Sequence, residues 1–228
     1  MKLLLIRHGL TDWVGKRLPG RIPGIHLNAE GHAQAGALAR RLAELPLAAV
    51  YSSPLERALE TAQPLAASYG FKPEVREALG EVDCGEWAGR DLEALQTESL
   101  WPVIRAYPSA ARFPGGESLR EARDRMVALL DGIRDAHQGQ MVAVVSHADP
   151  IRLAAAHYAG IALDLFQRLV ISPASVTAFE LLDLRPRLIC LNSTEDLATI
   201  LLADRHPSLS GQNHDSDPSL GMDQPGGP

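Results

Sequence analysis

Residues 2–9 read Lys-Leu-Leu-Leu-Ile-Arg-His-Gly, a short apolar run that two basic residues and a glycine close at once. Two comparable runs lie further along the chain, at 47–51 before a pair of serines and at 141–146 before a histidine. A continuous apolar run without polar alternation predicts a strand that is buried on both faces. Such strands belong to sheets that carry helices on either side. The sequence therefore predicts an α/β fold, a three-layer sandwich with a mostly parallel central sheet flanked by helices.

Helix-start signals separate these runs. Residues 53–56 read Ser-Pro-Leu-Glu, which offers a serine cap, a proline at the first helical position and a glutamate three residues after the serine. Residues 118–121 read Ser-Leu-Arg-Glu and repeat the capping pattern ahead of an apolar stripe with helical spacing. Asp149 before a proline indicates a third start by the same reasoning. Further elements are expected at three places: a helix over 29–45, and strands over 175–181 and 187–191.

The composition excludes several classes of protein. The 228 residues carry 22 Lys plus Arg against 28 Asp plus Glu, a net charge of −6, and a general nucleic-acid binder would carry a basic excess. No apolar run approaches the roughly 20 residues that span a bilayer, and the first run is too short for a signal-peptide core. We therefore expect a cytoplasmic protein with no membrane or nucleic-acid partner. The two cysteines form neither a disulfide framework nor a zinc spacing, so no metal or cofactor is expected.

The composition divides the chain into a long folded part and a short C-terminal segment. Residues 205–228 contain four Gly, four Pro and four Ser and no aromatic residue, a composition that cannot bury enough apolar area to offset its ordering entropy. We interpret this segment as a flexible tail and residues 1–204 as one domain.

Basic residues follow the ends of the three predicted strands. Arg7 and His8 follow the first strand, Arg57 lies one turn into the helix after the second, and His147 follows the third. In open α/β sheets, ligands bind outside the carboxyl ends of the strands. Two of these strand ends lead into helix N-termini, which attract anions. The sequence therefore predicts a phosphate or sulfate site that holds two arginines and two histidines.

The ordered set of motifs resembles the histidine phosphatase superfamily, in its phosphoglycerate mutase-like branch. The matching segments are Arg-His-Gly-x-Thr at 7–11, Ser-Ser-Pro-Leu-Glu-Arg-Ala at 52–58, Leu-Gly-Glu-Val-Asp-Cys-Gly-Glu-Trp-Ala-Gly at 79–89, Pro-Gly-Gly-Glu-Ser at 114–118, Val-Val-Ser-His at 144–147 and Leu-Asn-Ser-Thr at 191–194. Together they cover about residues 2–194, and they are closest to the phosphatase members and to a subgroup named for phosphomutases. The resemblance implies a small cap insert before residue 114 that roofs the site, although its aromatic residues could equally form a cluster that supports the cap.

The resemblance assigns a role to each matching residue. It implies that His8 is the nucleophile that accepts the phosphoryl group, as a neutral imidazole can near pH 7. It implies that Arg7 and Arg57 clamp the phosphoryl oxygens and that His147 donates to one of them. Glu81 is implied to be the proton donor to the leaving group. Phosphoryl transfer asks mainly for positioning and charge neutralisation, so this set needs no metal.

Three departures from the family pattern surround these residues. Val14 stands where the family has a phosphate-binding Asn, and Pro19 where it often has Ser or Thr. The possible substrate-binding residues nearby are Thr11, Arg17 and Gly20. Lys16, Arg17, Arg21 or the backbone N–H groups at Gly15 could compensate for the lost donors. Asp149 replaces the second of two glycines. We interpret it as a helix cap, with a charge near the phosphate or a contact to a cationic part of the substrate as alternatives.

We expect a metal-independent phosphatase that hydrolyses a small-molecule phosphomonoester through a phosphohistidine intermediate. A phosphoglycerate mutase and a non-catalytic phosphate-binding pseudoenzyme are the alternatives. A fourth interpretation is a cysteine-dependent phosphatase, since Cys84 and Arg90 have the spacing of that class. The substrate stays open among phosphoserine, a nucleotide-loop precursor, a sugar phosphate and phosphoglycerate. Family members are monomers or dimers, so either state is expected.

Overall fold

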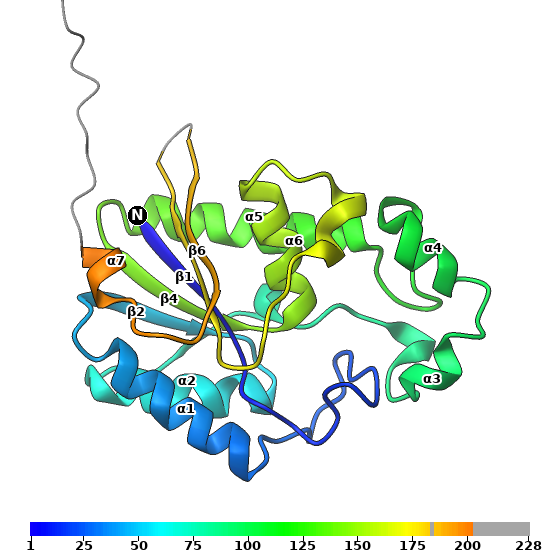
Figure 1. Cartoon of the computed structure of the whole chain (residues 1–228), viewed down its shortest axis with the longest axis horizontal. Coiled ribbons are helices and arrows are strands. Elements are labelled where there is room, and N and C mark those ends of the chain that lie inside the picture. Colours follow the sequence, from blue (N-terminus) through cyan, green and yellow to red (C-terminus); the bar gives the residue numbers. More distant parts are fainter. Residues whose placement is uncertain (183–184, 203–228) are drawn as a thin grey trace, which may run out of the picture.

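The computed structural model describes residues 1–182 and 185–202. One six-stranded sheet runs through it in the order β3-β2-β4-β1-β5-β6 (Figure 1). Its strands are β1 (Lys2–Arg7), β2 (Leu47–Ser52), β3 (Glu74–Val75), β4 (Met141–Ser146), β5 (Val176–Glu180) and β6 (Arg187–Ser193). Strands β1 to β4 pair in parallel, whereas β5 pairs antiparallel with both β1 and β6. The expected α/β fold with a mostly parallel sheet is confirmed.

Helices cover both faces of the sheet. The helices are α1 (Ala29–Leu42), α2 (Glu56–Ser68), α3 (Leu92–Leu95), α4 (Trp101–Ala106), α5 (Leu119–Ala136), α6 (Ala148–Tyr158) and α7 (Ala198–Leu202). Short 3-10 turns lie at Glu77–Leu79, Gly85–Trp87, Pro108–Ala110 and Leu163–Arg168. Helices α1 and α2 lie against one face and α5 and α6 against the other, which gives the three layers (Figure 1).

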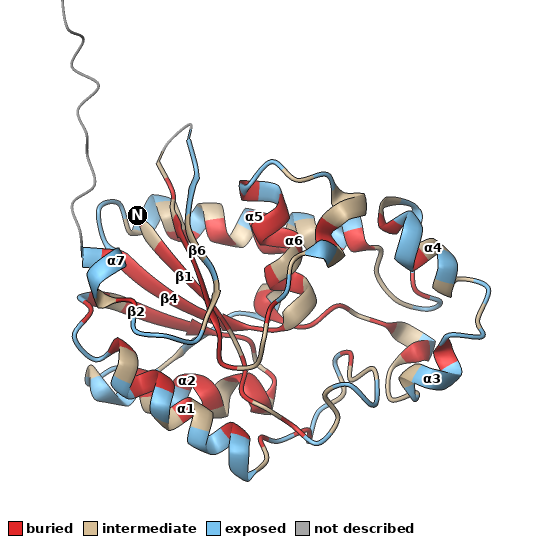
Figure 2. Cartoon of the chain, viewed as in Figure 1, coloured by how far each residue is buried: buried red, intermediate tan, exposed pale blue. Residues whose placement is uncertain are grey.

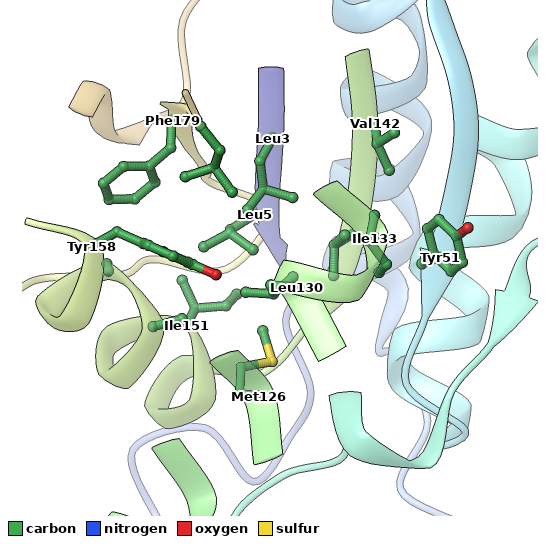
Figure 3. Close-up of a cluster of buried hydrophobic side chains, with 14 of the residues drawn as sticks. Leu3, Leu5, Tyr51, Met126, Leu130, Ile133, Val142, Ile151, Tyr158 and Phe179 are labelled. Carbon is green, nitrogen blue, oxygen red and sulfur yellow. The ribbon is translucent and has the colours of Figure 1, made fainter. Parts of the chain in front are cut away.

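Strand β1 forms the centre of the core. Its side chains Leu3, Leu4, Leu5 and Ile6 are fully buried, whereas Lys2 and Arg7 at its two ends are half-buried, and in Figure 2 the strand is red along most of its length. Successive side chains point to opposite faces of a strand. Leu3 and Leu5 accordingly pack with α5 and α6, as Figure 3 shows, and Leu4 and Ile6 pack with α1 and α2. This two-sided burial explains why the strand reads as a continuous apolar run.

A third cluster lies under the insert that holds α3 and α4. Trp87 contacts Trp101 at a ring-centroid distance of 6.5 Å and Phe113 at 5.6 Å, and the cluster packs onto α6 through Leu153. In Figure 1 this insert projects beyond one end of the layers. Trp101 and Phe113 therefore act as supports for the insert, whereas Tyr107 is exposed.

Two of the predicted helix starts are wrong. Helix α2 begins at Glu56 after an extended Leu55 rather than at Pro54, and the Ser53 hydroxyl contacts His147. Helix α6 begins at Ala148 with His147 at the N-cap position, so Asp149 lies inside the first turn and is not the cap. The Ser118 capping box on α5 is confirmed in both of its hydrogen bonds. Helix α1 begins at Ala29 as expected and ends three residues earlier than predicted.

None of the helices in the described ranges 1–182 and 185–202 is long and apolar enough to cross a membrane. The predicted tail, 205–228, lies outside those ranges.

Candidate active site

His8 follows the last residue of β1 and is almost fully buried. Its Nδ1 lies 2.7 Å from the carbonyl oxygen of Gly9. Because a carbonyl only accepts, Nδ1 carries the proton and Nε2 keeps a free lone pair. Burial, together with the charges of Arg57 and Arg7, lowers the pKa of His8 to about 3. The imidazole is therefore neutral at pH 7 and presents Nε2 as a nucleophile.

Gly9 fixes the path of the chain after His8. Its N–H donates to the Thr61 hydroxyl at 2.9 Å, and a Cβ atom at this position would lie 2.7 Å from the carbonyl oxygen of Gly31. The loop after β1 thus lies directly against the first turn of α1, at a distance that only glycine permits. This contact sets the position of the carbonyl that holds the His8 ring.

Arg57 lies in the first turn of α2 and is fully buried. Its Nη2 donates to the carbonyl oxygen of Gly20 at 2.8 Å, while Nε and Nη1 have no hydrogen-bond partner among the described residues. Arg7 at the end of β1 is held in the same way, since Nη1 donates to Ile171 at 2.7 Å and Nε has no partner in the described ranges. Burial lowers the pKa of both groups from the ordinary value for arginine. Each arginine is thus anchored by backbone and keeps donors free.

His147 stands beside His8, with the two ring centroids 5.2 Å apart and the rings in an edge-to-face arrangement. Its Nε2 lies 2.7 Å from the Ser53 hydroxyl, and its buried Nδ1 has no partner in the described part of the chain. Burial, then the charge of Arg57, lowers the pKa of His147 well below its ordinary value. The ring is therefore neutral. It can donate from Nδ1 if Ser53 donates its hydroxyl proton to Nε2.

Glu81 is buried, and its Oε1 accepts a hydrogen bond from the N–H of Val82 at 2.9 Å. Burial, and then the negative charge of Asp149, raise the pKa of Glu81 to about 7, although Arg57 and Arg7 oppose the shift. A carboxyl group with that pKa is half protonated near neutrality. It can donate a proton in one step and accept one in the next.

The five predicted catalytic and phosphate-binding residues therefore come together at one edge of the sheet. His8 interacts electrostatically with both arginines and lies beside His147, and Glu81 interacts with the same arginines. The site also lies at two helix N-termini, because Arg57 belongs to the first turn of α2 and His147 precedes α6. Anions bind at such termini.

The three possible substrate-binding residues, Thr11, Arg17 and Gly20, have different surroundings in the structure. Arg17 pairs with Asp91 at 2.9 Å and lies over the Trp13 ring, so its guanidinium is engaged by these two side chains. Gly20 contributes its carbonyl to Arg57 and so acts on the site through that side chain. Thr11 is buried in the loop after β1. The structure therefore gives Arg17 and Gly20 partners within the protein itself.

Asp149 and Cys84 were each given alternative interpretations from the sequence. Asp149 pairs with Arg152 at 2.8 Å and raises the pKa of Glu81, so the alternative of a charge near the phosphate site fits better than a cap. Cys84 is buried, its thiol donates to the Val82 carbonyl at 3.3 Å, and burial raises its pKa well above the ordinary value. A thiol held in its protonated form is not a nucleophile, which argues against the cysteine-dependent mechanism.

Several residues that shape the site were not predicted from the sequence. Ser53 was assigned to a helix start, and the carbonyl of Ile171 carries no side-chain signal at all. Asn192 accepts from the N–H of Ser172 at 2.5 Å and so holds the loop that anchors Arg7. It lies in the Leu-Asn-Ser-Thr motif, which was a signal for the family but not for this contact. Among the described residues, no group of three or more His, Cys, Asp or Glu could hold a metal ion.

The chain belongs to the histidine phosphatase superfamily (branch 1), whose family model matches residues 3–194. Among its relatives, phosphoserine phosphatase 1 of Hydrogenobacter thermophilus is 31% identical over 200 residues, covering 85% of this chain and 93% of that protein. Phosphoglycerate mutase-like protein 4 of Arabidopsis thaliana is 35% identical over 161 residues, covering 66% of this chain and 68% of that protein.

Comparison with solved structures also finds phosphatases of similar fold. Phosphoserine phosphatase from Entamoeba histolytica, in complex with 3-phosphoglyceric acid, superposes with a TM-score of 0.78 at 27% identity, covering 86% of this chain and 98% of that one. Mycobacterial glucosyl-3-phosphoglycerate phosphatase in complex with VO3 superposes with a TM-score of 0.77 at 26% identity, covering 85% and 99%. Membership of this family makes the chain a phosphatase or mutase-type enzyme.

Proposed function

We propose that this protein is a metal-independent phosphatase that hydrolyses a small-molecule phosphomonoester through a phosphohistidine at His8. The observation that carries the proposal is the set of buried donors around His8. Arg7 Nε, Arg57 Nε and Nη1, and His147 Nδ1 have no partner among the described residues. An unpaired buried donor costs about 1–3 kcal/mol, and more if it is charged. A tetrahedral dianion at this place would satisfy them together.

In the first step, the lone pair on His8 Nε2 attacks phosphorus and the bond from phosphorus to the ester oxygen breaks. The departing alkoxide takes the proton from Glu81, which becomes a carboxylate. Arg7, Arg57 and His147 hold the three phosphoryl oxygens while their charge redistributes. The Gly9 carbonyl accepts from Nδ1 throughout, so the phosphorylated ring keeps its orientation.

In the second step, a water molecule attacks phosphorus and gives its proton to the Glu81 carboxylate, while the bond from phosphorus to Nε2 breaks. Inorganic phosphate leaves, and His8 and Glu81 return to their first state. One carboxyl group serves both steps because its pKa of about 7 lets both protonation states be populated near neutral pH.

The substrate class rests on the relatives. The solved structures include phosphoserine phosphatases and a glucosyl-3-phosphoglycerate phosphatase, whose names describe small phosphorylated metabolites. We therefore place the substrate among small phosphomonoesters and expect neither a nucleic acid nor a membrane as partner. A mutase remains the second candidate, because relatives are named phosphoglycerate mutase-like.

The test follows turnover of an aryl phosphate by purified protein in EDTA. We expect hydrolysis, and we expect His8→Ala to reduce kcat by a factor of about 10⁴ or more, since the nucleophile is lost. Cys84→Ser is the matched control at a buried residue near the site, and it should leave kcat within about threefold. Acid-labile, base-stable phosphate bound to the wild-type protein and absent from His8→Ala would report the intermediate.

Three results would count against the proposal. Loss of activity in Cys84→Ser alone would point to a thiolate enzyme. Interconversion of 2- and 3-phosphoglycerate that outpaces hydrolysis would point to a mutase. No turnover of any phosphomonoester, together with phosphate binding, would point to a phosphate-binding pseudoenzyme.

A further inference from the structure

We propose that Glu117, acting through Arg21 and Arg125, is a positioning residue that aims the carboxyl group of Glu81 at the ester oxygen. The inference rests on the proposed function, in which Glu81 is the proton donor. Glu117 itself lies in the Pro-Gly-Gly-Glu-Ser segment at 114–118, to which the sequence assigned no chemistry.

A single peptide group, the one that joins Glu81 to Val82, links the two residues. Its N–H donates to Oε1 of Glu81 at 2.9 Å, so this peptide sets the direction of the carboxyl group. Its carbonyl oxygen accepts from Arg21 Nε at 2.9 Å and from Arg125 Nη2 at 3.0 Å. Two cationic donors on the carbonyl both fix the plane of the peptide and polarise its N–H into a stronger donor.

Both arginines are held by one carboxylate. Arg125 donates to Glu117 from Nη2 at 2.7 Å and from Nε at 3.0 Å, and Arg21 donates from Nη2 at 3.2 Å. The Glu117 carboxylate also accepts the N–H of Asp83 at 2.8 Å. Its side chain is only 14% exposed and that of Arg125 is 19% exposed, so solvent screens the pair weakly. Burial raises the pKa of Glu117, but the bonds from Arg125 and Asp83 outweigh it and keep the group ionised.

Close backbone contact explains how a residue 36 positions from Glu81 reaches this place. The N–H of Glu117 donates to the Asp83 carbonyl at 3.0 Å, and the N–H of Glu86 donates to that of Pro114 at 2.8 Å. A Cβ at Gly116 would lie 2.3 Å from the Asp83 oxygen, and one at Gly85 would lie 2.1 Å from the Pro114 oxygen. The glycines of both segments therefore let the two backbones touch.

The chain just before Glu81, at Ala78 and Leu79, is also held in place by hydrogen bonds. Arg125 Nη1 donates to the carbonyl of Ala78 at 2.7 Å, and the Ser146 hydroxyl at the end of β4 donates to that of Leu79 at 2.7 Å. The chain before Glu81 is thus tied to the sheet, and the peptide after it to the arginine pair. Removal of the Glu117 charge would leave Arg21 and Arg125 free to move away from the carbonyl of Glu81. It would also leave two uncompensated positive charges beside Glu81.

This arrangement predicts a defect that depends on the leaving group. An alkyl phosphate needs a proton from Glu81 because an alkoxide is a poor leaving group, whereas a p-nitrophenolate leaves without one. We expect Glu117→Gln to lower kcat/KM for glycerol phosphate about tenfold or more and that for p-nitrophenyl phosphate less than threefold. The uncompensated arginines also favour the carboxylate form of Glu81, so the alkaline limb of the alkyl-phosphate profile should move to lower pH.

The experiment compares kcat/KM for both esters, from pH 5 to 9, in wild type and in the variants Glu117→Gln, Arg21→Gln, Glu81→Gln and Glu121→Gln. Glu121→Gln is the matched control. Glu121 pairs with Arg112 and closes the capping box at the start of α5, the helix that also carries Arg125, but it does not contact the Glu81 segment. Arg21→Gln removes one of the two donors to the Glu81 carbonyl at a side chain that is 41% exposed, and it carries the test if Glu117→Gln does not fold.

The outcomes separate this inference from the function on which it rests. Selective loss of glycerol phosphate turnover in Glu81→Gln and Glu117→Gln, or in Glu81→Gln and Arg21→Gln, with Glu121→Gln unchanged, supports it. Selective loss in Glu81→Gln combined with an equal loss on both esters, or no loss, in Glu117→Gln and Arg21→Gln overturns the inference and leaves the proposed function intact. A loss in Glu81→Gln that is equal for both esters overturns the inference together with the proton-donor role of Glu81, while hydrolysis through His8 is still judged by His8→Ala.

Discussion

At the scale of single residues, the site is a set of polar groups whose ordinary pKa values burial has changed. His8 and His147 are kept neutral and Glu81 is kept partly protonated. These shifts have opposite directions for base and acid, yet burial is the largest cause of each. Burial at one positively charged site thus prepares both the proposed nucleophile, His8, and the proposed proton donor, Glu81.

The pKa of Glu81 predicts the pH dependence of the reaction. The carboxyl group is mostly protonated below about pH 7 and mostly ionised above it, so it loses the proton that the proposed mechanism needs as pH rises. Above that value, kcat/KM for an alkyl phosphate should fall toward tenfold per pH unit, while that for p-nitrophenyl phosphate stays flat. Asp149→Asn removes a charge that raises this pKa, so the alkaline limb of the kcat/KM profile for the alkyl phosphate should move to lower pH. A limb that stays in place in Asp149→Asn would contradict the electrostatic assignment.

Ser53 offers a second test at this scale. Its hydroxyl accepts the N–H of Leu55 at 3.3 Å and contacts His147 Nε2 at 2.7 Å. In the proposed mechanism this hydroxyl donates to Nε2, so Nδ1 carries the proton and donates to the phosphoryl group. Ser53→Ala removes the hydrogen bond that fixes the tautomer of His147, so kcat should fall about tenfold. This fall is smaller than the one expected when a direct donor to the phosphoryl group is removed. Ser52→Ala is the control, because that hydroxyl bonds only to the neighbouring carbonyl among the described residues; an equal loss in both would refute the tautomer argument.

That the candidate side chains lie together could be predicted from the sequence, whereas the backbone groups that hold the two arginines could not. His8, Arg7, Arg57, Glu81 and His147 each combine a chemically distinctive side chain with a place at a strand end or in a motif. The anchors of the two arginines are the carbonyls of Gly20 and Ile171, which lie far from them in the chain, and no local pattern marks a carbonyl. Arg17, which stays a possible substrate-binding residue, pairs with Asp91 in the structure, a contact that its charge alone does not indicate.

At the scale of elements, the strands were predictable because each is buried on both faces and reads as an apolar run. The helix starts predicted at Pro54 and Pro150 were wrong. The Ser53 hydroxyl contacts His147 and Asp149 pairs with Arg152, and a cap pattern alone cannot show such competing partners. The short helices of the insert, α3 and α4, carry too few turns for a periodic signal.

The contact between α1 and the loop after β1 yields a prediction about stability and activity together. A Cβ at Gly31 would lie 2.1 Å from the Leu10 carbonyl oxygen, so Gly31→Ala must displace the backbone beside His8. We expect a loss of about 2 kcal/mol in the free energy of unfolding and a fall in kcat of about tenfold or more. Urea unfolding and steady-state kinetics measure both.

The matched control for this prediction lies in another helix. A Cβ at Gly132 in α5 would have no described atom within 4 Å outside its own helix backbone and chain neighbours. Gly132→Ala should therefore stabilise the protein by about 0.5–1 kcal/mol and leave kcat unchanged. If Gly31→Ala behaves like Gly132→Ala, the close approach does not position His8.

At the scale of the whole molecule, the site makes stability depend on pH. In the folded state His8 stays neutral down to about pH 3, whereas in the unfolded chain it takes up a proton below about 6.5. Stability is therefore lost as pH falls below 6.5. Glu81 acts in the opposite direction, because its proton is kept up to about pH 7 and stability falls as pH rises from 4.5.

The difference between a variant and the wild type isolates the first effect. His8→Gln removes the histidine titration, so its free energy of unfolding relative to wild type should rise by about 1.4 kcal/mol for each pH unit below 6.5. Urea unfolding at pH 8, 6 and 5 measures this slope. A difference that does not change with pH would show that His8 is not held neutral by the fold.

The central place of β1 has a consequence for how the chain acquires its structure. Strand β1 lies between β4 and β5, whose residues begin about 140 and 170 positions later. Loops of that length close slowly, so pairing of β1 is a late event in folding. During synthesis, β1 is made before both of its partner strands, so this apolar strand stays unpaired until β4 and β5 have been made. Unpaired apolar strands are prone to aggregate, so the chain is most exposed to misfolding during that interval.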